Sequence, residues 1–414
     1  MSDSRNLGLF EGFGVEIEYM IVDAEDLSIR PLADELLKTV AGSYQMEVDR
    51  GDLRWSNELA LHLIELKTNG PVDSLVGISE AFQRDVVEIN TLLESRGARL
   101  LPSGMHPFMH PEELRLWPHE DDIIYQALHR IFDCRGHGWS NLQSVHLNLP
   151  FRDDGELGRL HAAIRLVLPI LPALAASSPY VDGRASGLLD TRLDVYRTNA
   201  RSIPSVTGRV IPEAVFTRAD YERLLETIYA DLRPLDEEGI LQHEWINARG
   251  CIARFDRMAL EIRLLDVQEC PKMDLAVAQA VVAAIQALVE ERWTSLEEQK
   301  AWSEHDLEPI LARTIRDADL TIIDDQRFTR VFGIRANGSL RAGDLWQHLV
   351  DAEVASHPDR TWALPALQTI LKDGCLGRRL LAAAGPSPSR ATLEAVYGRL
   401  ADCLARGEAF SVLP

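Results

Sequence analysis

Apolar and polar residues alternate along several stretches of this chain, and the alternation predicts β-strands. The strands are expected at 14–22, 59–67, 99–101, 144–149 and 259–266. Elsewhere apolar residues recur at helical spacing, which predicts helices over 73–95, 155–176, 221–232 and 274–293. Two prolines should bend the second helix, and Asp274 is the expected N-cap of the last.

Beyond residue 294 the spacing is helical, with helices expected over 295–316, 340–356, 362–372 and 391–405. The chain therefore divides into an α+β domain over 1–293 and a helical C-terminal region over 294–414 packed on it. Residues 177–213 are rich in Gly, Ser, Pro and Arg, and we expect a long ordered loop there.

The predicted strands place acidic side chains among apolar ones. Glu16 and Glu18 share one face of their strand, because residues two apart point the same way. The other strands carry Glu65, His146 with Asn148, and Glu261 with Arg263. Neighbouring carboxylates are costly to bury unless a positive charge lies between them. The pattern favours a sheet face that holds Mg²⁺ or Mn²⁺, which in turn bind nucleotide phosphates.

For single residues, interpretations without a functional role stay open. A lone glutamate on a strand often faces solvent, and His146 by itself is typical of a hydrogen-bonded core histidine. The arginines of the 177–213 segment (Arg192, Arg197, Arg201 and Arg209) suit a carboxylate or a phosphate, although a solvated loop would look the same. Arg263, beside Glu261 on an apolar strand, suits a phosphate clamp better.

Composition and charge narrow the function class. The 414 residues are 46% hydrophobic and 26% charged, which is typical of a globular protein, and the net charge is −21. That charge argues against binding nucleic acid or an anionic membrane. Five scattered cysteines indicate reduced thiols, and residues 1–10 lack the apolar run of a signal peptide. The apolar run 275–289 is short for a bilayer. We expect a cytoplasmic protein.

Phosphate-binding glycine motifs of the Walker A and G-x-G-x-x-G types do not occur before a helix in this sequence. Six other motifs occur in order: GVEIEY (14–19), IELKTN (64–69), GMHPF (104–108), QSVHLN (143–148), AASSPY (175–180) and LEIRLLD (260–266). Over about residues 10–290 the chain thereby resembles the glutamate–cysteine ligase type 2 family, carboxylate–amine ligases related to glutamine synthetase.

The resemblance implies a curved antiparallel sheet that forms a funnel-shaped active site, with ATP and Mg²⁺ or Mn²⁺ on its acidic face. ATP would phosphorylate a carboxylate, classically the γ-carboxylate of glutamate, and an amine such as cysteine would displace the phosphate to give an amide. The partners would be small-molecule carboxylate and amine substrates, and a homodimer stays open.

The resemblance also implies residue roles. The metal ligands would be Glu16, Glu18, Glu65, His146 and Glu261. Arg263 and Glu261 would be catalytic, and Lys67 with Arg263 would contact the nucleotide. The substrate-binding residues would be Arg192, Arg197, Asn148 and Gln143. Replacing Glu16 or Glu261 by Gln should then abolish activity and leave the fold nearly intact.

Two departures from the family pattern concern the substrate end of the site. The family has a second acid four residues before Glu65, where this chain has Leu61, so the earlier Glu58 either replaces it or faces away. The segment between Trp245 and Glu261 is longer than usual. The alternatives are a small-molecule kinase of guanidino or carboxyl groups with the same fold, and a non-catalytic protein that binds a nucleotide or metabolite.

Overall fold

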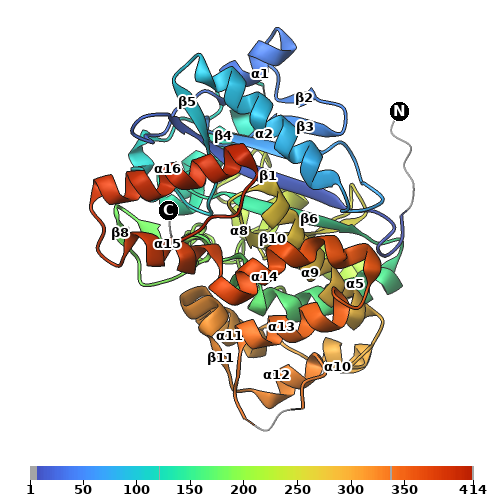
Figure 1. Ribbon diagram of the computed structural model, residues 1–414. Helices are drawn as coiled ribbons and strands as arrows, with labels where there is room; N and C mark the ends of the chain where they lie inside the picture. Colours follow the sequence, from blue (N-terminus) through green and yellow to red (C-terminus); the bar gives the residue numbers. More distant parts are fainter. Residues whose placement is uncertain (1–6, 121, 336–337, 413–414) are drawn as a thin grey trace.

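A single antiparallel sheet organises the N-terminal part of the protein (Figure 1). The computed structural model describes residues 7–120, 122–335 and 338–412. In this part of the chain the strand order is β2-β3-β4-β1-β6-β10-β9, and β5 also pairs with β1. The strands are β1 (Gly14–Asp23), β2 (Glu47–Asp49), β3 (Leu53–Asn57), β4 (Leu63–Thr68), β5 (Ala98–Leu101), β6 (Ser144–Pro150), β9 (Cys251–Arg254) and β10 (Ala259–Asp266).

The register confirms the predicted alternation on β1. Val15, Ile17 and Tyr19 are fully buried on one face, and Glu16 and Glu18 lie on the other. Glu16 pairs with Lys67 of β4 and with His146 of β6, and Glu18 pairs with Glu65. On β10, Glu261 pairs with Asn148. The polar residues of four strands therefore share one face of the sheet.

Helices cover the other parts of the structure and complete the core. The α-helices are α1 (Ala33–Ala41), α2 (Ile78–Glu94), α3 (Asp122–Phe132), α4 (His137–Ser140), α5 (Asp154–Val167), α6 (Pro172–Ala175), α7 (Thr191–Tyr196), α8 (Arg218–Leu232), α9 (Pro271–Val289), α10 (Leu296–Lys300), α11 (Glu304–Asp317), α12 (Gln326–Val331), α13 (Ala342–Glu353), α14 (Leu364–Asp373), α15 (Leu376–Ala384) and α16 (Arg390–Arg406). The 3₁₀ helices are η1 (Pro111–Glu113), η2 (Leu168–Ile170), η3 (Glu244–Ile246), η4 (Ala318–Leu320) and η5 (Pro358–Ala363).

The most apolar helix, α9, is an internal helix. It packs against α2, α5 and α13, and 89% of its most apolar window is buried. By length and composition it could cross a membrane, but a core helix passes the same test. Its N-cap is Cys270, so the prediction of Asp274 as the cap was wrong. Asp274 lies one turn further on, and its carboxylate accepts a hydrogen bond from the backbone N–H of Gln268.

The structure changes several other predicted elements. The helix expected over 155–176 is divided at its prolines into α5, η2 and α6. The strand expected from residue 59 begins only at Leu63, and the segment expected as a loop at 177–213 contains α7 together with the short strands β7 (Tyr180–Val181) and β8 (Arg184–Ala185).

The region after residue 294 is mainly helical, as expected, but it also contains a two-stranded sheet of β11 (Ile322–Ile323) and β12 (Leu340–Arg341). The indole N–H of Trp346 on α13 donates to the backbone oxygen of Ile170 at 2.7 Å. Side chains from both sides of residue 294 contribute to one hydrophobic core. The division into 1–293 and 294–414 stays a prediction. The absence of a signal peptide also stays a prediction, because residues 1–6 of the N-terminal segment lie outside the described residues.

Candidate functional site

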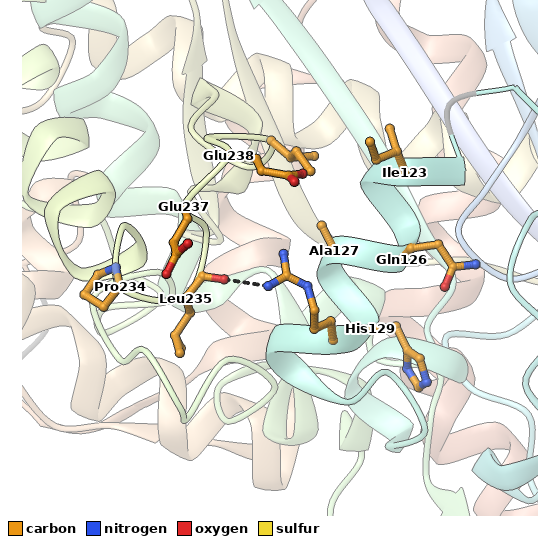
Figure 2. Close-up of a pocket in the computed structure, with 10 residues that line it drawn as sticks. Ile123, Gln126, Ala127, His129, Pro234, Leu235, Glu237 and Glu238 are labelled. Atoms are coloured by element: carbon orange, nitrogen blue, oxygen red, sulfur yellow. Dashed lines mark hydrogen bonds between the residues drawn. The ribbon is translucent and has the colours of Figure 1, made fainter.

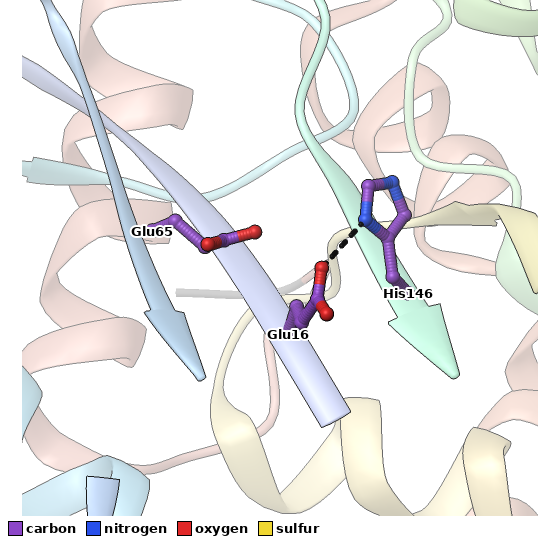
Figure 3. A group of neighbouring side chains, drawn as sticks. All are labelled: Glu16, Glu65 and His146. Carbon is purple, nitrogen blue, oxygen red and sulfur yellow. Dashed lines mark hydrogen bonds and ion pairs between the residues drawn. The ribbon is translucent and has the colours of Figure 1, made fainter. Parts of the chain in front are cut away.

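Two carboxylates and one imidazole meet on the polar face of the sheet (Figure 3). Glu16 of β1, Glu65 of β4 and His146 of β6 each offer a ligand atom, and these atoms lie within 4.8 Å of one another. The Nδ1 atom of His146 lies 3.1 Å from Oε2 of Glu16. The three strands are neighbours in the sheet, so the register itself assembles this group.

A second group of ligand atoms shares Glu65 with the first. Glu18, Glu58 and Glu65 also bring one oxygen each within 4.8 Å of one another. Glu58 follows the end of β3, and the preceding residue, Asn57, is held by a hydrogen bond from Nδ2 to the hydroxyl of Tyr125 at 2.9 Å. Glu58 therefore faces the cluster rather than away from it.

The crowding of these acids shifts their pKa values. Burial, followed by the charge of Glu16, raises the pKa of Glu65 to about 7. Burial and the charges of Glu18 and Glu65 raise the pKa of Glu58 well above its usual range. Burial also disfavours ionised Glu16, but the hydrogen bond and charge of His146 lower the pKa of that carboxyl below its usual range.

The donor set fits a hard divalent cation. Four carboxylates are gathered where the nearest ammonium, that of Lys67, lies 3.4 Å from Glu65 and 2.7 Å from Glu47. Carboxylate oxygens are the ligands that Mg²⁺ and Mn²⁺ prefer, and a cation between them would offset the burial and the repulsion from Glu16 that raise the pKa of Glu65. Asn148 adds a buried Oδ1 atom without a hydrogen-bond partner, while its Nδ2 donates to Glu16.

Beside this cluster, one buried glutamate fixes two arginines. Glu261 is 1% exposed, and its two oxygens accept from Nε of Arg263 at 2.6 Å and from Nη1 of Arg254 at 2.9 Å. Burial opposes the charges of both partners, yet their attraction lowers the pKa of Glu261 and raises that of Arg263. Both guanidinium groups therefore stay cationic and fixed in place, which suits the binding of phosphate oxygens.

The two predicted substrate arginines lie in different surroundings. Arg192 is 2% exposed; Nη1 lies 3.2 Å from Asp266, and Nη2 donates to the backbone oxygen of Arg263 at 2.7 Å. These contacts give Arg192 a structural role in holding β10. Arg197, by contrast, keeps 31% of its side chain exposed and pairs loosely with Asp194 and Glu308.

Asp266 joins three of the motifs recognised in the sequence. Its carboxylate accepts from the backbone N–H of Ser177 and the hydroxyl of Ser178, both at 2.8 Å. A Cβ atom on Gly104 would lie 2.4 Å from the Asp266 carboxyl carbon, so only glycine fits there. Gln143 is buried nearby, where its backbone N–H donates to the oxygen of Gly104 and its side-chain Nε2 has no partner.

Sequence reasoning missed the roles of Arg254 and Arg257. The second of these reaches Oε1 of Glu16 at 3.3 Å from the turn between β9 and β10. The unusual length of the segment before Glu261 could have indicated these roles, because this segment forms the hairpin of β9 and β10. Glu58 was identified only as one of two alternatives, because a bend after a short strand decides where it points.

A surface cleft of about 570 Å³ lies between α3 and the segment 234–240 (Figure 2). Ile123 and Leu235 are exposed apolar residues in its wall, and Arg130 donates to the backbone oxygen of Leu235 at 2.9 Å. None of the residues of the two acidic groups lines it. The cleft is thus separate from the candidate cation site.

Comparison with known proteins gives a consistent family relationship. A family model described as Glutamate-cysteine ligase family 2 (GCS2) matches residues 12–398. A protein of Archaeoglobus fulgidus described only as uncharacterized is 40% identical over 67% of this chain and 75% of its own length. A protein of Cupriavidus metallidurans named "Putative glutamate--cysteine ligase 2" is 30% identical over 56% of this chain. The matched region spans 60% of that relative.

Two solved structures share the fold. The glutamate–cysteine ligase of Francisella tularensis in complex with AMP has a TM-score of 0.58 at 12% identity, over 97% of this chain and 89% of that one. A bifunctional glutathione synthetase from Pasteurella multocida has a TM-score of 0.61 at 15% identity, over 98% of this chain and 54% of that one. These findings confirm the expected α+β fold class and the resemblance to carboxylate–amine ligases.

Proposed function

The chain belongs to glutamate–cysteine ligase family 2, and we propose from this that it is an ATP-dependent ligase that joins a small-molecule carboxylate to an amine. The observation that carries the proposal is the shared Glu65, which joins two groups of cation ligands on one sheet face next to the fixed guanidinium of Arg263. A nucleotide held through cations needs such a surface and does not need a glycine-rich loop.

The ligands for the cations would be Glu16, Glu65 and His146 in one group and Glu18, Glu58 and Glu65 in the other. Bound there, Mg²⁺ or Mn²⁺ would neutralise phosphate charge and orient the nucleotide. Glu261 belongs to neither group, because its oxygens are taken by Arg254 and Arg263. In this proposal it acts as a positioning residue rather than as the cation ligand expected from the sequence.

The reaction transfers the terminal phosphoryl group of ATP to the carboxylate, and the amine then attacks the acyl phosphate and releases phosphate. Arg263 and Arg254 stabilise charge on the transferred phosphoryl group, since Glu261 holds both rigidly. Lys67 contacts the nucleotide from the β4 side of the sheet, and Arg197 binds the carboxylate substrate. Asn148 and Gln143 offer an oxygen and an amide N–H that have no partner within the described protein.

The proposal can be tested by measuring ADP release from the purified protein with ATP, Mg²⁺, glutamate and a panel of amines that includes cysteine. ADP should appear only with a competent pair, and mass spectrometry should detect an amide product. A stable phosphorylated product without an amide would indicate a kinase instead, and nucleotide binding without turnover would indicate a binding protein. ADP release that is independent of every carboxylate and amine would contradict the proposal.

A further inference from the structure

A second cleft lies at the opposite end of the molecule from the acidic sheet face. It has a volume of about 880 Å³ and is formed by α10, the start of α11, α12 and the segments beside them. In Figure 1, α10 and α12 lie at the bottom of the view, and β2, β3 and β4 lie at the top. This size falls within the range of roughly 300–1,000 Å³ that is typical of small-molecule sites.

Basic residues outnumber acidic ones in the wall of the cleft, although the protein carries a net charge of −21. Four arginines line it: Arg292, Arg327, Arg330 and Arg335. Among the described residues, the side chains of Arg330 and Arg335 have no acidic partner, and both are exposed. Arg292 pairs with Glu353, and Arg327 pairs with Asp325 at 2.7 Å.

The two acids in the wall are already engaged. Glu298 closes a capping box with Ser295, and Asp306 closes one with Ser303. Their carboxylates accept hydrogen bonds from the backbone N–H and hydroxyl groups of these serines, and this lowers the pKa of both acids. Both acids stay ionised, and Asp306 also lies 3.8 Å from Arg327. In the described part of the chain, neither acid forms an ion pair with Arg330 or Arg335.

Two indoles complete the cleft. The Arg327 guanidinium lies 5.2 Å from the ring centre of Trp302, which holds it against the wall. A Cβ atom on Gly333 would lie 2.5 Å from the Trp293 ring, and the φ angle of this glycine is 78°. Only glycine allows the backbone to lie so close to the indole. The segment that carries Arg330 and Arg335 is thereby set against Trp293.

We propose that this cleft binds a small phosphate-bearing anion of the nucleoside polyphosphate class. Arg330 and Arg335 would contact the phosphates, because guanidinium groups bind phosphate oxygens in a bidentate manner. Trp293 would contact the base, since indole rings stack on nucleobases. The site is independent of the ligase reaction and needs no divalent cation, since its charges are positive.

The test uses calorimetry on the full chain in EDTA, which removes the cations that the acidic face requires. The probes are ADP, inorganic tripolyphosphate and adenosine. We expect saturable binding of one ADP, with tripolyphosphate weaker and adenosine weakest. Binding of tripolyphosphate as tight as that of ADP would assign the site to free polyphosphate and overturn the role of Trp293. Binding of none of the probes would overturn the whole proposal.

Variants locate the binding. Arg330→Gln combined with Arg335→Gln should weaken ADP binding at least about tenfold, since two charge-assisted contacts are lost. Arg316→Gln is the matched control, because Arg316 is also exposed but pairs with Asp317 outside the cleft. Glu65→Gln, which alters the acidic face, should leave this binding unchanged. An unchanged affinity in the double variant, or an equal loss in the control, would overturn the assignment.

Discussion

Glu18 and Glu65 lie directly opposite each other on neighbouring antiparallel strands, and Glu58 brings a third carboxylate to the same point. Like charges in this arrangement destabilise a sheet. Lys67 lies 3.4 Å from Glu65, and Arg257 lies 3.3 Å from Glu16 in the adjoining group. The cluster is therefore poised to gain stability from a bound ion.

Glu65 should make the cation-free protein less stable at higher pH. Its pKa in the folded protein is about 7, above the usual 4.5, so ionisation is harder in the folded than in the unfolded state. This contribution to stability is present below about pH 4.5 and is lost as the pH rises through about 7. In EDTA, the thermal unfolding midpoint should fall as the pH rises from about 4.5 to about 7, and Glu65→Gln should reduce that fall. Equal slopes in the two proteins would refute this role.

Mg²⁺ or Mn²⁺ should stabilise the protein through Glu58. A ligand that binds only the folded state raises the free energy of unfolding, by about 2.7 kcal/mol at a concentration of one hundred times Kd, and the unfolding midpoint rises with it. Glu58→Gln should lose most of this gain, because it removes one oxygen from the second group. Glu113→Gln is the control, since Glu113 is exposed on η1. Differential scanning fluorimetry over a range of Mg²⁺ concentrations measures both; an equal gain in both variants would place the cation elsewhere.

Glu261→Gln should abolish turnover and also destabilise the fold. The sequence alone suggested relief of repulsion, but Glu261 is held between Arg254 and Arg263. Removing its charge takes the acidic partner from the largely buried Arg263 and leaves Arg254 with only Glu244 and Asp256, which costs on the order of 3 kcal/mol. Urea denaturation should show the loss. A fully stable Glu261→Gln protein would mean that solvent compensates both arginines.

Arg192→Ala should lower the stability of the protein, whereas Arg197→Ala should weaken the binding of substrate. Arg192 is buried against Asp266, so its removal should cost about 3 kcal/mol or more in unfolding free energy. Arg197 is partly exposed with loose ion pairs, so its loss should hardly change stability and should raise KM for the carboxylate substrate. Denaturation curves and steady-state kinetics separate the two roles. A normal KM in Arg197→Ala would exclude it from the substrate site.

Gly104→Ala should disturb the contacts that Asp266 makes with the segments around Gly104 and Ser177. The added methyl group would lie 2.4 Å from the Asp266 carboxyl carbon, and the surroundings of that carboxyl are fully packed. Overpacking of this kind costs about 1–3 kcal/mol. The unfolding midpoint should fall, and Gly136→Ala, where no atom lies within 4 Å, should change it little.

The sequence predicted that Glu16, Glu65 and His146 share one face of the sheet, because one period-two pattern places all three. On β1 the parity of Glu16 and Glu18 is fixed by the buried residues between them, and the same holds for His146 and Asn148 on β6. Once the faces are known, the order of the strands in the sheet decides which of these side chains meet. The strands β2, β3 and β9 were not predicted, so the residues that they position were missed or left open.

Arg192 shows why the type of a residue does not reveal its partner. An arginine in a polar segment has the same signature whether it binds substrate or a buried aspartate, and only the fold brings Asp266 to it. Asp274 is a similar case, because a helix can begin several residues before an acid that resembles a cap. In both cases a long-range contact, rather than local propensity, decides the role.

The irregularity in β10 has a consequence for comparing relatives. Between Ile262 and Leu265 this strand advances three residues while β6 advances two, so one residue is extra. Glu261 and Asp266 can therefore face the same side although they are five positions apart. In a relative without the extra residue, the matching acids must be four positions apart, as their partners Asn148 and Ser144 are on β6. In aligned sequences of the family, the number of positions between these two acids therefore identifies the relatives that keep the bulge.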